Sequence, residues 1–375
     1  MRTEIIDLPG TAPGTRQSLR VLRFGAAGAR PKVYVQAALH ADEVPAILVA
    51  QQLARQLTEL ESRGAVVGEI VLVPFANPIG LDQVALGAHL GRFDLRDGVN
   101  FNRGFADLAA LVVDRLRAQL SDDARRNTGL IRAALLDAAD HLDAGGSAQA
   151  LKNRLLKLAI DADIVLDLHC DGEAVLHVYA LTPQQETAER LGAALGARAL
   201  LLASDSGEAP FDEACSRPWL QLQRALPAFP IELACFGATV ELRGQLDTDH
   251  TLASKDASGL CLFFAHQGVL AGPAAPLTGC FPVSVCAATP LASSEPIVAP
   301  VAGVVVFHRR PGEHVEAGDV IADLVDVESG VITSLRCQSA GLLYAVCGAR
   351  WAYAGKRLAK IAGSTLARTG NLLSP

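Results

Sequence analysis

Short apolar runs alternate with amphipathic helical segments along roughly the first 270 residues, and this alternation constrains the fold more than any other feature. Two of the runs, EIVLVPF and IVLDL, are almost continuously apolar, which is typical of strands buried on both faces. Such alternation favours an α/β fold, a mixed but mostly parallel sheet flanked by helices. The predicted strands are Lys32–Ala38, Glu69–Phe75, Ile164–Leu168, Ala199–Ala203, Ile231–Ala234 and Thr239–Leu242, and the predicted helices are Pro45–Leu60, Ala106–Leu120, Leu151–Ile160, Glu186–Leu195 and Leu252–Val269.

The pattern changes near Ala271. From Gly279 to Gly363, short Val-rich strands are separated by Gly turns, and no helix is predicted. We therefore predict two domains, residues 1–272 and an all-β domain at residues 279–365, joined by the linker GPAAPL. The β domain resembles a lipoyl/biotinyl-type barrel-sandwich hybrid. No Lys lies between Lys255 and Lys356, so the hairpin that carries the prosthetic group in carrier domains has no acceptor here.

Composition narrows the class of protein. The net charge of -7 and the pI near 5.7 argue against a nucleic-acid partner, which usually needs a basic patch. No apolar stretch reaches the roughly 18 to 20 residues that span a bilayer, and the start MRTEIIDLPG lacks the apolar segment of a signal peptide. Eight scattered cysteines without a C-x-x-C pair indicate reduced thiols. We therefore expect a cytoplasmic protein that binds neither nucleic acid nor membranes.

Two chemically distinctive motifs follow predicted strands. The segment HADE, with His40 and Glu43, comes directly after the first strand, and Asp167-Leu168-His169 ends the third. In an open α/β sheet, ligands bind beyond the carboxyl ends of the strands, so these side chains are expected to converge. Two imidazoles and a carboxylate are the ligand set of a catalytic zinc site that leaves one position for water. Taken singly, each motif is common and is also compatible with no metal at all.

The segment from Gly91 to Arg103 contains three Arg and two Asn close to a predicted sheet edge. Arg offers planar, bidentate donors to a carboxylate, and Asn adds neutral donors, so the segment is suited to binding an anion. The alternative is a solvated surface loop with ordinary Arg–Asp pairs.

Two glutamates lie in apolar runs, Glu241 in ATVEL and Glu232 in PIELACF. An unpaired buried carboxylate is costly, so such a residue is expected to face a site. A glutamate beside a metal-bound water can take a proton and pass it to a leaving amine. The residue pattern alone leaves both glutamates open for this role.

Taken together and in order, these motifs resemble the succinylglutamate desuccinylase/aspartoacylase family, a branch of the zinc carboxypeptidase-like fold. They are His-x-x-Glu, Asn-Pro after the second strand, Asn-Arg, Asp-Leu-His and a late strand Glu, and they run from about Lys32 to Gly244. The resemblance implies one Zn²⁺ per chain. It implies zinc ligation by His40, Glu43 and His169, substrate-carboxylate binding by Asn102 and Arg103, and general acid/base catalysis by Glu241.

Family members also use an Arg upstream of the Asn-Arg pair to polarise the scissile carbonyl. Arg96 is preferred for this role by its spacing, and Arg92 is also in range as a substrate-binding residue. The segment reads Asn-Phe-Asn-Arg, which looks closer to the branch with deacetylases of N-acetyl diamino acids than to the enzymes that give the family its name.

The resemblance implies hydrolysis of the amide bond of a small N-acyl amino acid. The β domain is expected to pack beside the active site and restrict it to small substrates, or to form subunit contacts in a dimer or tetramer. Two alternatives stay open: a metallocarboxypeptidase acting on short peptides, and a zinc-binding relic without catalysis.

Overall fold

The structure is a computed structural model that describes residues 1–10, 12–143, 145–272, 281–365 and 367–373. Most of the predicted linker after Gly272 and the residue Cys280 lie outside the described residues. The other seven cysteines are free thiols.

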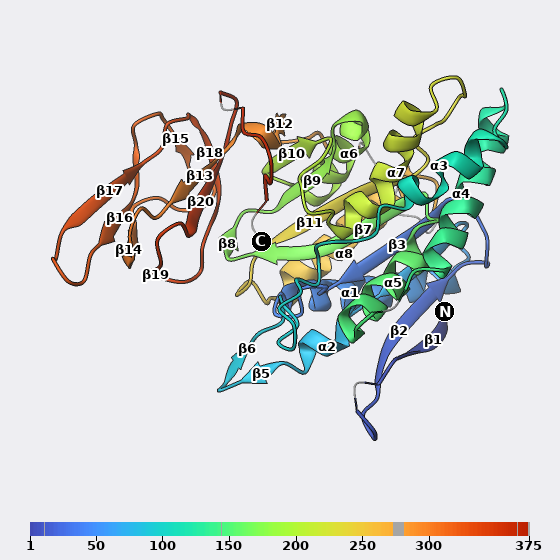
Figure 1. Cartoon of the computed structure of the whole chain (residues 1–375), viewed down its shortest axis with the longest axis horizontal. Coiled ribbons are helices and arrows are strands. Elements are labelled where there is room, and N and C mark those ends of the chain that lie inside the picture. The colour runs from blue at the N-terminus through green and yellow to red at the C-terminus, as the bar shows by residue number, and fades with distance from the viewer. Residues whose placement is uncertain (11, 144, 273–280, 366, 374–375) are drawn as a thin grey trace.

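One mixed sheet of nine strands, in the order β1-β2-β4-β3-β7-β11-β9-β10-β12, forms the centre of the larger part of the chain (Figure 1). Its central strands β4, β3, β7 and β11 run parallel, whereas β1, β2 and the β11–β9 contact are antiparallel. The predicted α/β fold with a mostly parallel sheet is therefore confirmed. The strands are β1 Arg2–Leu8, β2 Gln17–Phe24, β3 Lys32–Ala37, β4 Glu69–Val73, β7 Ile164–Asp171, β9 His177–Leu181, β10 Ala199–Ala203, β11 Phe236–Gly244 and β12 Ala288–Pro290.

Helices cover both faces of this sheet (Figure 1). In β3, Val33 and Val35 belong to one apolar core and Tyr34 to the other, because successive side chains of a strand point to opposite faces. The first core includes residues of α1 Pro45–Ser62, α6 Gln185–Leu195 and α8 His250–His266, and the second includes residues of α3 Leu108–Arg117, α4 Ala124–Asp140, α5 Ser147–Ala159 and α7 Phe211–Ala225. The short α2 Pro78–Leu81 and the hairpin of β5 Val84–Ala85 and β6 Ala88–His89 complete this part.

The predicted strand Ile231–Ala234 is wrong, because this segment is irregular and lies outside the sheet. Its carbonyl groups, and that of the next residue, accept hydrogen bonds from side chains instead of from a neighbouring strand. Gln223 donates to Ile231 O, Arg132 to Ala234 O and Gln184 to Cys235 O. The strand begins only at Phe236, after these contacts.

The C-terminal region is β-rich, as predicted, and consists of two antiparallel sheets packed around their own apolar core. One sheet has the order β13-β20-β18-β15 and the other β17-β16-β14-β19. The strands are β13 Ser294–Val298, β14 Gly303–Phe307, β15 His314–Val315, β16 Val320–Val325, β17 Ile332–Arg336, β18 Gly341–Val346, β19 Trp351–Ala352 and β20 Arg357–Gly363. The boundaries 1–272 and 279–365 stay a prediction.

The β-rich region contacts the carboxyl end of β7. The short strand β8, Glu173–Ala174, follows β7 and pairs with β18. The Lys360 ammonium lies 2.5 Å from the Asp171 carboxylate at the end of β7. A fourth apolar cluster joins β9 and β10 to β18. The edge of the sheet where the sequence places the metal-binding motifs is therefore also where the two regions meet.

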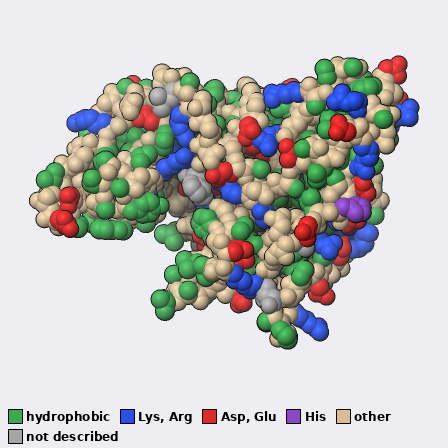
Figure 2. Space-filling view, viewed as in Figure 1, with side chains coloured by type: hydrophobic (Ala, Val, Ile, Leu, Met, Phe, Trp, Pro, Cys, Tyr) green, Lys and Arg blue, Asp and Glu red, His purple; other side chains and the backbone are tan. Residues whose placement is uncertain are grey.

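On the face seen in Figure 2, basic and acidic side chains are intermingled and form no extended basic patch. In the described part of the chain, none of the helices combines the length and apolar character that crossing a bilayer requires.

Candidate active site

His40 and Glu43 lie in a tight turn between β3 and α1. The turn closes through a hydrogen bond from Glu43 N–H to His40 O, 3.1 Å long. Ala38, at the end of β3, has φ of 56°, a left-handed conformation that a residue with a Cβ rarely adopts. This strained step directs the chain from the strand into the turn, where His40 Nδ1 lies 3.1 Å from Glu43 Oε1.

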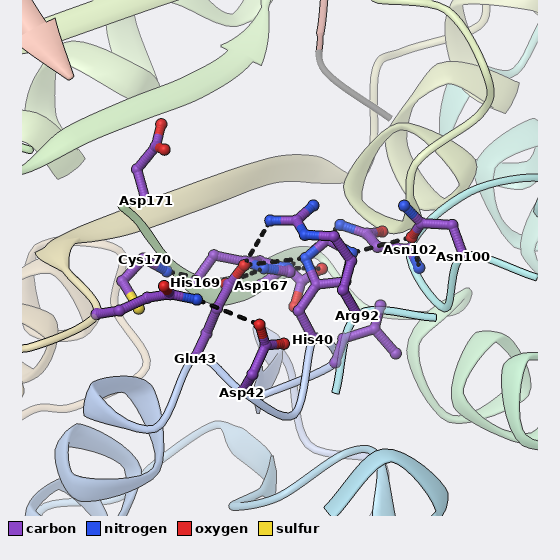
Figure 3. A network of polar contacts seen from close by, with 12 residues as sticks. His40, Asp42, Glu43, Arg92, Asn100, Asn102, Asp167, His169, Cys170 and Asp171 are labelled. Carbon is purple, nitrogen blue, oxygen red and sulfur yellow. Dashed lines mark hydrogen bonds and ion pairs between the residues drawn. The ribbon is translucent and has the colours of Figure 1, made fainter. Parts of the chain in front are cut away.

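His169 joins this pair from β7. Its Nδ1 lies 2.8 Å from Glu43 Oε2, although the two residues are 126 positions apart in the sequence (Figure 3). One ligand atom from each of the three residues lies within 4.8 Å of the others, and the residues are 97 to 99% buried. The predicted cluster of His40, Glu43 and His169 is thus assembled, and it could hold a divalent cation.

Each imidazole is also held from its outer nitrogen. His169 Nε2 lies 2.9 Å from Asp167 Oδ2, and His40 Nε2 lies 2.9 Å from Asn100 Oδ1. Gln36 on β3 donates to the other oxygen of Asp167. A carboxylate or carbonyl oxygen behind a histidine fixes the orientation of the ring and is typical of histidines that bind metals. Asn100 was expected as a neutral donor to an anion and as a departure from the family motif, and this contact with His40 was not predicted.

The electrostatic state of the cluster follows from its burial. Burial alone raises the pKa of Glu43, but the two histidines overcome this effect and hold the pKa well below its usual range. Burial lowers the pKa of His169, but Asp167 and Glu43 hold it well above its usual range. For His40, burial and Arg92 lower the pKa to about 4, so this imidazole is neutral at pH 7. An ionised carboxylate and a neutral imidazole are forms that bind a cation.

Arg92, not Arg96, lies at this cluster. Arg92 Nη2 is 3.0 Å from Glu43 Oε1, and the residue lines the cavity described below (Figure 3). Arg96 donates from Nη1 to Ser147 Oγ and does not line the cavity. Gly91 explains the difference, because a Cβ there would lie 2.2 Å from the Asp42 nitrogen. Because Gly91 has no side chain, its carbonyl oxygen can accept a hydrogen bond from Ala41 N–H at 3.0 Å. This contact places Arg92 beside the cluster of three candidate ligands. Of the two arginines that the sequence offered, Arg92 is the one beside the cluster, and the catalytic role of either arginine stays a prediction.

Asn102 and Arg103 follow in the same loop, and both line the cavity. Asn102 Nδ2 lies 3.2 Å from His169 Nε2, and Asn102 Oδ1 accepts from the backbone N–H of Phe211, the first residue of α7. Arg103 Nη1 donates to Asn102 O, and Arg103 Nε lies 3.4 Å from Glu208 Oε2. Asn102 thus connects His169 to α7, and the guanidinium of Arg103 lies in the cavity wall.

Glu241 lies beside the cluster on β11, directly opposite His169 of β7 in the parallel register. Its Oε2 is buried and has no hydrogen-bond partner among the described residues. Burial, Glu43 and Asp171 raise the pKa of Glu241 to about 8, despite the opposing effect of His169. Glu232 is exposed and lies in the irregular segment before β11. Of the two glutamates that the sequence left open, only Glu241 lines the cavity.

These residues line a cavity of about 150 Å³. A buried water needs only some 10 to 15 Å³ on the same measure, so the space fits a small organic molecule. Much of the wall comes from parts of the chain to which the sequence assigned no site residue. These are Tyr179 on β9, Ser206 in the loop after β10, Asp212 and Glu213 at the start of α7, and the C-terminal residues Ala345, Val346, Cys347, Arg357, Leu358, Ala359, Lys360 and Leu373. Burial and Glu213 raise the pKa of Asp212 to about 7.

The comparison with family models identifies residues 29–266 as a succinylglutamate desuccinylase/aspartoacylase catalytic domain. The chain belongs to the succinylglutamate desuccinylase/aspartoacylase family. Membership indicates a hydrolase of the deacylase type and agrees with the resemblance found in the motifs. No curated protein matches the sequence significantly.

Similar solved structures extend the similarity beyond the matched domain. A family protein from Shewanella amazonensis is 27% identical, with a TM-score of 0.82, over 96% of this chain and 98% of that one. A family protein from Shewanella frigidimarina is 24% identical, with a TM-score of 0.83, over 97% of each chain. The product-bound ectoine utilization protein EutE (DoeB) from Ruegeria pomeroyi is 17% identical, with a TM-score of 0.66, over 97% of this chain and 95% of that one. The C-terminal β-rich region is therefore within the similarity.

Proposed function

We propose that this chain is a zinc-dependent deacylase that hydrolyses the amide bond of a small N-acyl amino acid and releases a carboxylate and a free amine. The observation that carries the proposal is the buried cluster of His40, Glu43 and His169 in a cavity that also contains Glu241 and the Asn102–Arg103 pair. Metal ligands, a proton carrier and an anion-binding group are the parts that such a hydrolysis needs.

Zinc fits the donor set. Two imidazole nitrogens and one carboxylate, each held by an outer hydrogen-bond partner or a buried contact, match the ligands of catalytic zinc sites. Zinc bound there would supply Lewis-acid activation of water and of the scissile carbonyl. His40, Glu43 and His169 are the residues that would hold it.

Glu241 is proposed to carry the proton. Its carboxyl group has no competing hydrogen-bond partner at Oε2 and lies across from His169. Its raised pKa, about 8, makes the acid form accessible near neutral pH. A cation bound nearby favours the carboxylate form, so both forms are available during a catalytic cycle. Glu241 takes a proton from the attacking water and delivers it to the nitrogen of the leaving amine.

In this proposal Arg92 and Arg103 bind different parts of the substrate, the scissile carbonyl and the carboxylate of the amino acid. The Arg92 guanidinium is next to Glu43 and stabilises the negative charge that develops on the carbonyl oxygen. Arg103 binds the carboxylate of the amino acid, and Asn102 holds the loop against α7 so that both groups keep their places.

Arg92→Gln is expected to lower kcat about 100-fold, which is the usual effect of removing one donor to a developing oxyanion. Arg96→Gln, a matched change four residues away, is expected to leave kcat within about twofold, because Arg96 lies against Ser147. Steady-state kinetics of both variants, with zinc content measured in parallel, test the assignment. A larger loss of kcat in Arg96→Gln than in Arg92→Gln would reverse it.

The alternative function is a metallocarboxypeptidase, which would use the same ligands. The C-terminal region argues against it, because its residues line one side of the cavity and reduce the space for a long peptide. Hydrolysis of a panel of N-acetyl amino acids, beside N-blocked dipeptides, tests the proposal. We expect turnover of the N-acetyl amino acids alone. Turnover of the dipeptides alone would favour the peptidase, and bound zinc without turnover of either would favour the non-catalytic relic.

A further inference from the structure

The segment 367–373 leaves the β-rich region and runs towards the active site. In Figure 1 the dark red end of the described chain runs from the β-rich region towards the nine-stranded sheet. Leu372 is buried in the apolar cluster shared by β9, β10 and β18. Its carbonyl accepts from Arg357 and Arg368, at 3.2 and 3.0 Å. The segment is therefore anchored to the body of the protein.

The same segment contacts the loop between β10 and α7. Leu372 N–H donates to Ser206 O at 2.9 Å, and Asn371 Nδ2 donates to Glu208 Oε1 at 2.6 Å. Gly207 permits this approach, because a Cβ there would lie 2.5 Å from Asn371 Oδ1. Glu208 itself has φ of 62°, which a non-glycine residue adopts only when its surroundings enforce it.

Glu208 links this contact to the substrate site. One of its carboxylate oxygens accepts from Asn371, and the other lies 3.4 Å from Arg103 Nε. Its backbone carbonyl accepts from Gly104 N–H at 2.7 Å, directly after Arg103. Asn371 therefore fixes the carboxylate that in turn orients the guanidinium of Arg103.

Leu373 reaches the cavity itself. It is one of the cavity-lining residues, together with Leu201 and Leu291, and it adds to the apolar part of a wall that also carries charged side chains. A side chain in this position takes up space that a longer acyl group or amino-acid side chain would need.

We propose that residues 371–373 are part of the substrate site: Leu373 limits the size of the substrate, and Asn371 acts through Glu208 as a positioning residue for Arg103. The inference rests on the proposed deacylase function and adds to it the residues that set its selectivity. It concerns an element outside the matched catalytic domain, which ends at residue 266.

The test uses the full zinc-loaded chain and two series of substrates, N-acyl amino acids with acyl chains from acetyl to hexanoyl and N-acetyl amino acids with side chains of increasing length. Leu373→Ala is expected to raise the ratio of kcat/KM for the larger over the smaller members about tenfold, since a few buried methylene groups discriminate by this much. Leu111→Ala, an exposed change on α3, is the matched control and is expected to keep the wild-type ratio.

Asn371→Ala is expected to raise KM about fivefold with little change in kcat, because it removes a partly exposed hydrogen bond to a charged group and not a group that reacts. Asn371→Asp places a second negative charge against Glu208 and is expected to raise KM further, whereas Asn371→Gln keeps an amide donor and is expected to recover most of the loss.

The outcomes separate the two claims. A wild-type chain that hydrolyses no N-acyl amino acid contradicts the proposed function and this inference with it. An active wild-type chain whose size ratio is unchanged in Leu373→Ala, or whose Asn371 variants lower kcat without changing KM, keeps the proposed function and overturns the inference.

Discussion

Glu241→Gln is expected to lower kcat by about 1,000-fold while the protein keeps its zinc. The amide has nearly the same shape as the carboxyl group but can neither accept a proton from water nor deliver it to the leaving amine, and such proton transfer contributes 10² to 10⁴-fold to a rate. Glu241 is not one of the clustered ligand residues, so metal content is expected to stay near one equivalent. Single-turnover kinetics and metal analysis of the same preparation measure both quantities.

Glu232→Gln provides the matched control for this experiment. Glu232 was the other candidate in the sequence, and it is exposed in the irregular segment before β11. Its replacement is expected to change kcat by less than about twofold, as is usual for surface substitutions. Near-normal turnover in zinc-loaded Glu241→Gln would rule out this glutamate as the proton carrier.

His169→Ala is expected to abolish both stoichiometric zinc binding and turnover. The substitution removes one of the three proposed ligands and leaves the buried carboxylates of Glu43 and Asp167 without their shared partner. Because a metal that binds only the folded state stabilises it, zinc at 100 times its dissociation constant is expected to add about 2.7 kcal/mol to the unfolding free energy of the wild-type protein. Zinc is expected to add nothing to the unfolding free energy of His169→Ala.

Thermal unfolding with and without zinc, together with metal analysis, measures this effect. His141→Ala, an exposed change at the end of α4, is the control and is expected to behave as the wild type. Zinc that still binds His169→Ala in a one-to-one ratio, with the same thermal shift, would mean that the metal lies elsewhere.

The cluster of His40, Glu43 and His169 was predictable because each of its motifs sits at the end of a strand, and the strands were recognisable by their apolar runs. The carboxyl ends of β3 and β7, which are neighbours in the sheet, bring residues 126 positions apart within hydrogen-bond distance. The resemblance of the ordered motifs to the family then pointed to the same residues. Here local pattern, topology and chemistry agree.

The choice between Arg92 and Arg96 was not predictable from spacing along the sequence. It depends on how the loop approaches the turn that bears His40, and that approach is made possible by the missing side chain of Gly91. Gly91 was the available signal that the loop approaches the turn closely at Arg92. However, a glycine in a loop is also compatible with many other backbone arrangements.

Other parts of the site arise only from tertiary packing. The helix α7, with Pro218 in its interior, was not predicted from the pattern, yet it brings Asp212 and Glu213 to the cavity. Lys360 lies on an ordinary β-strand and becomes a site residue only because β20 packs beside the end of β7. Contacts between segments so distant in sequence leave no local trace in either of them.

Reconstitution of the metal-free protein with zinc tests the central claim most directly. Zinc is added in steps from zero to two equivalents, and hydrolysis of an N-acetyl amino acid is measured at each step. The structure predicts activity that rises linearly and stops rising at one equivalent, because one cluster of His40, Glu43 and His169 serves one cavity. Full hydrolysis by the metal-free protein, or zinc binding at one equivalent without hydrolysis of any N-acyl amino acid, would contradict it.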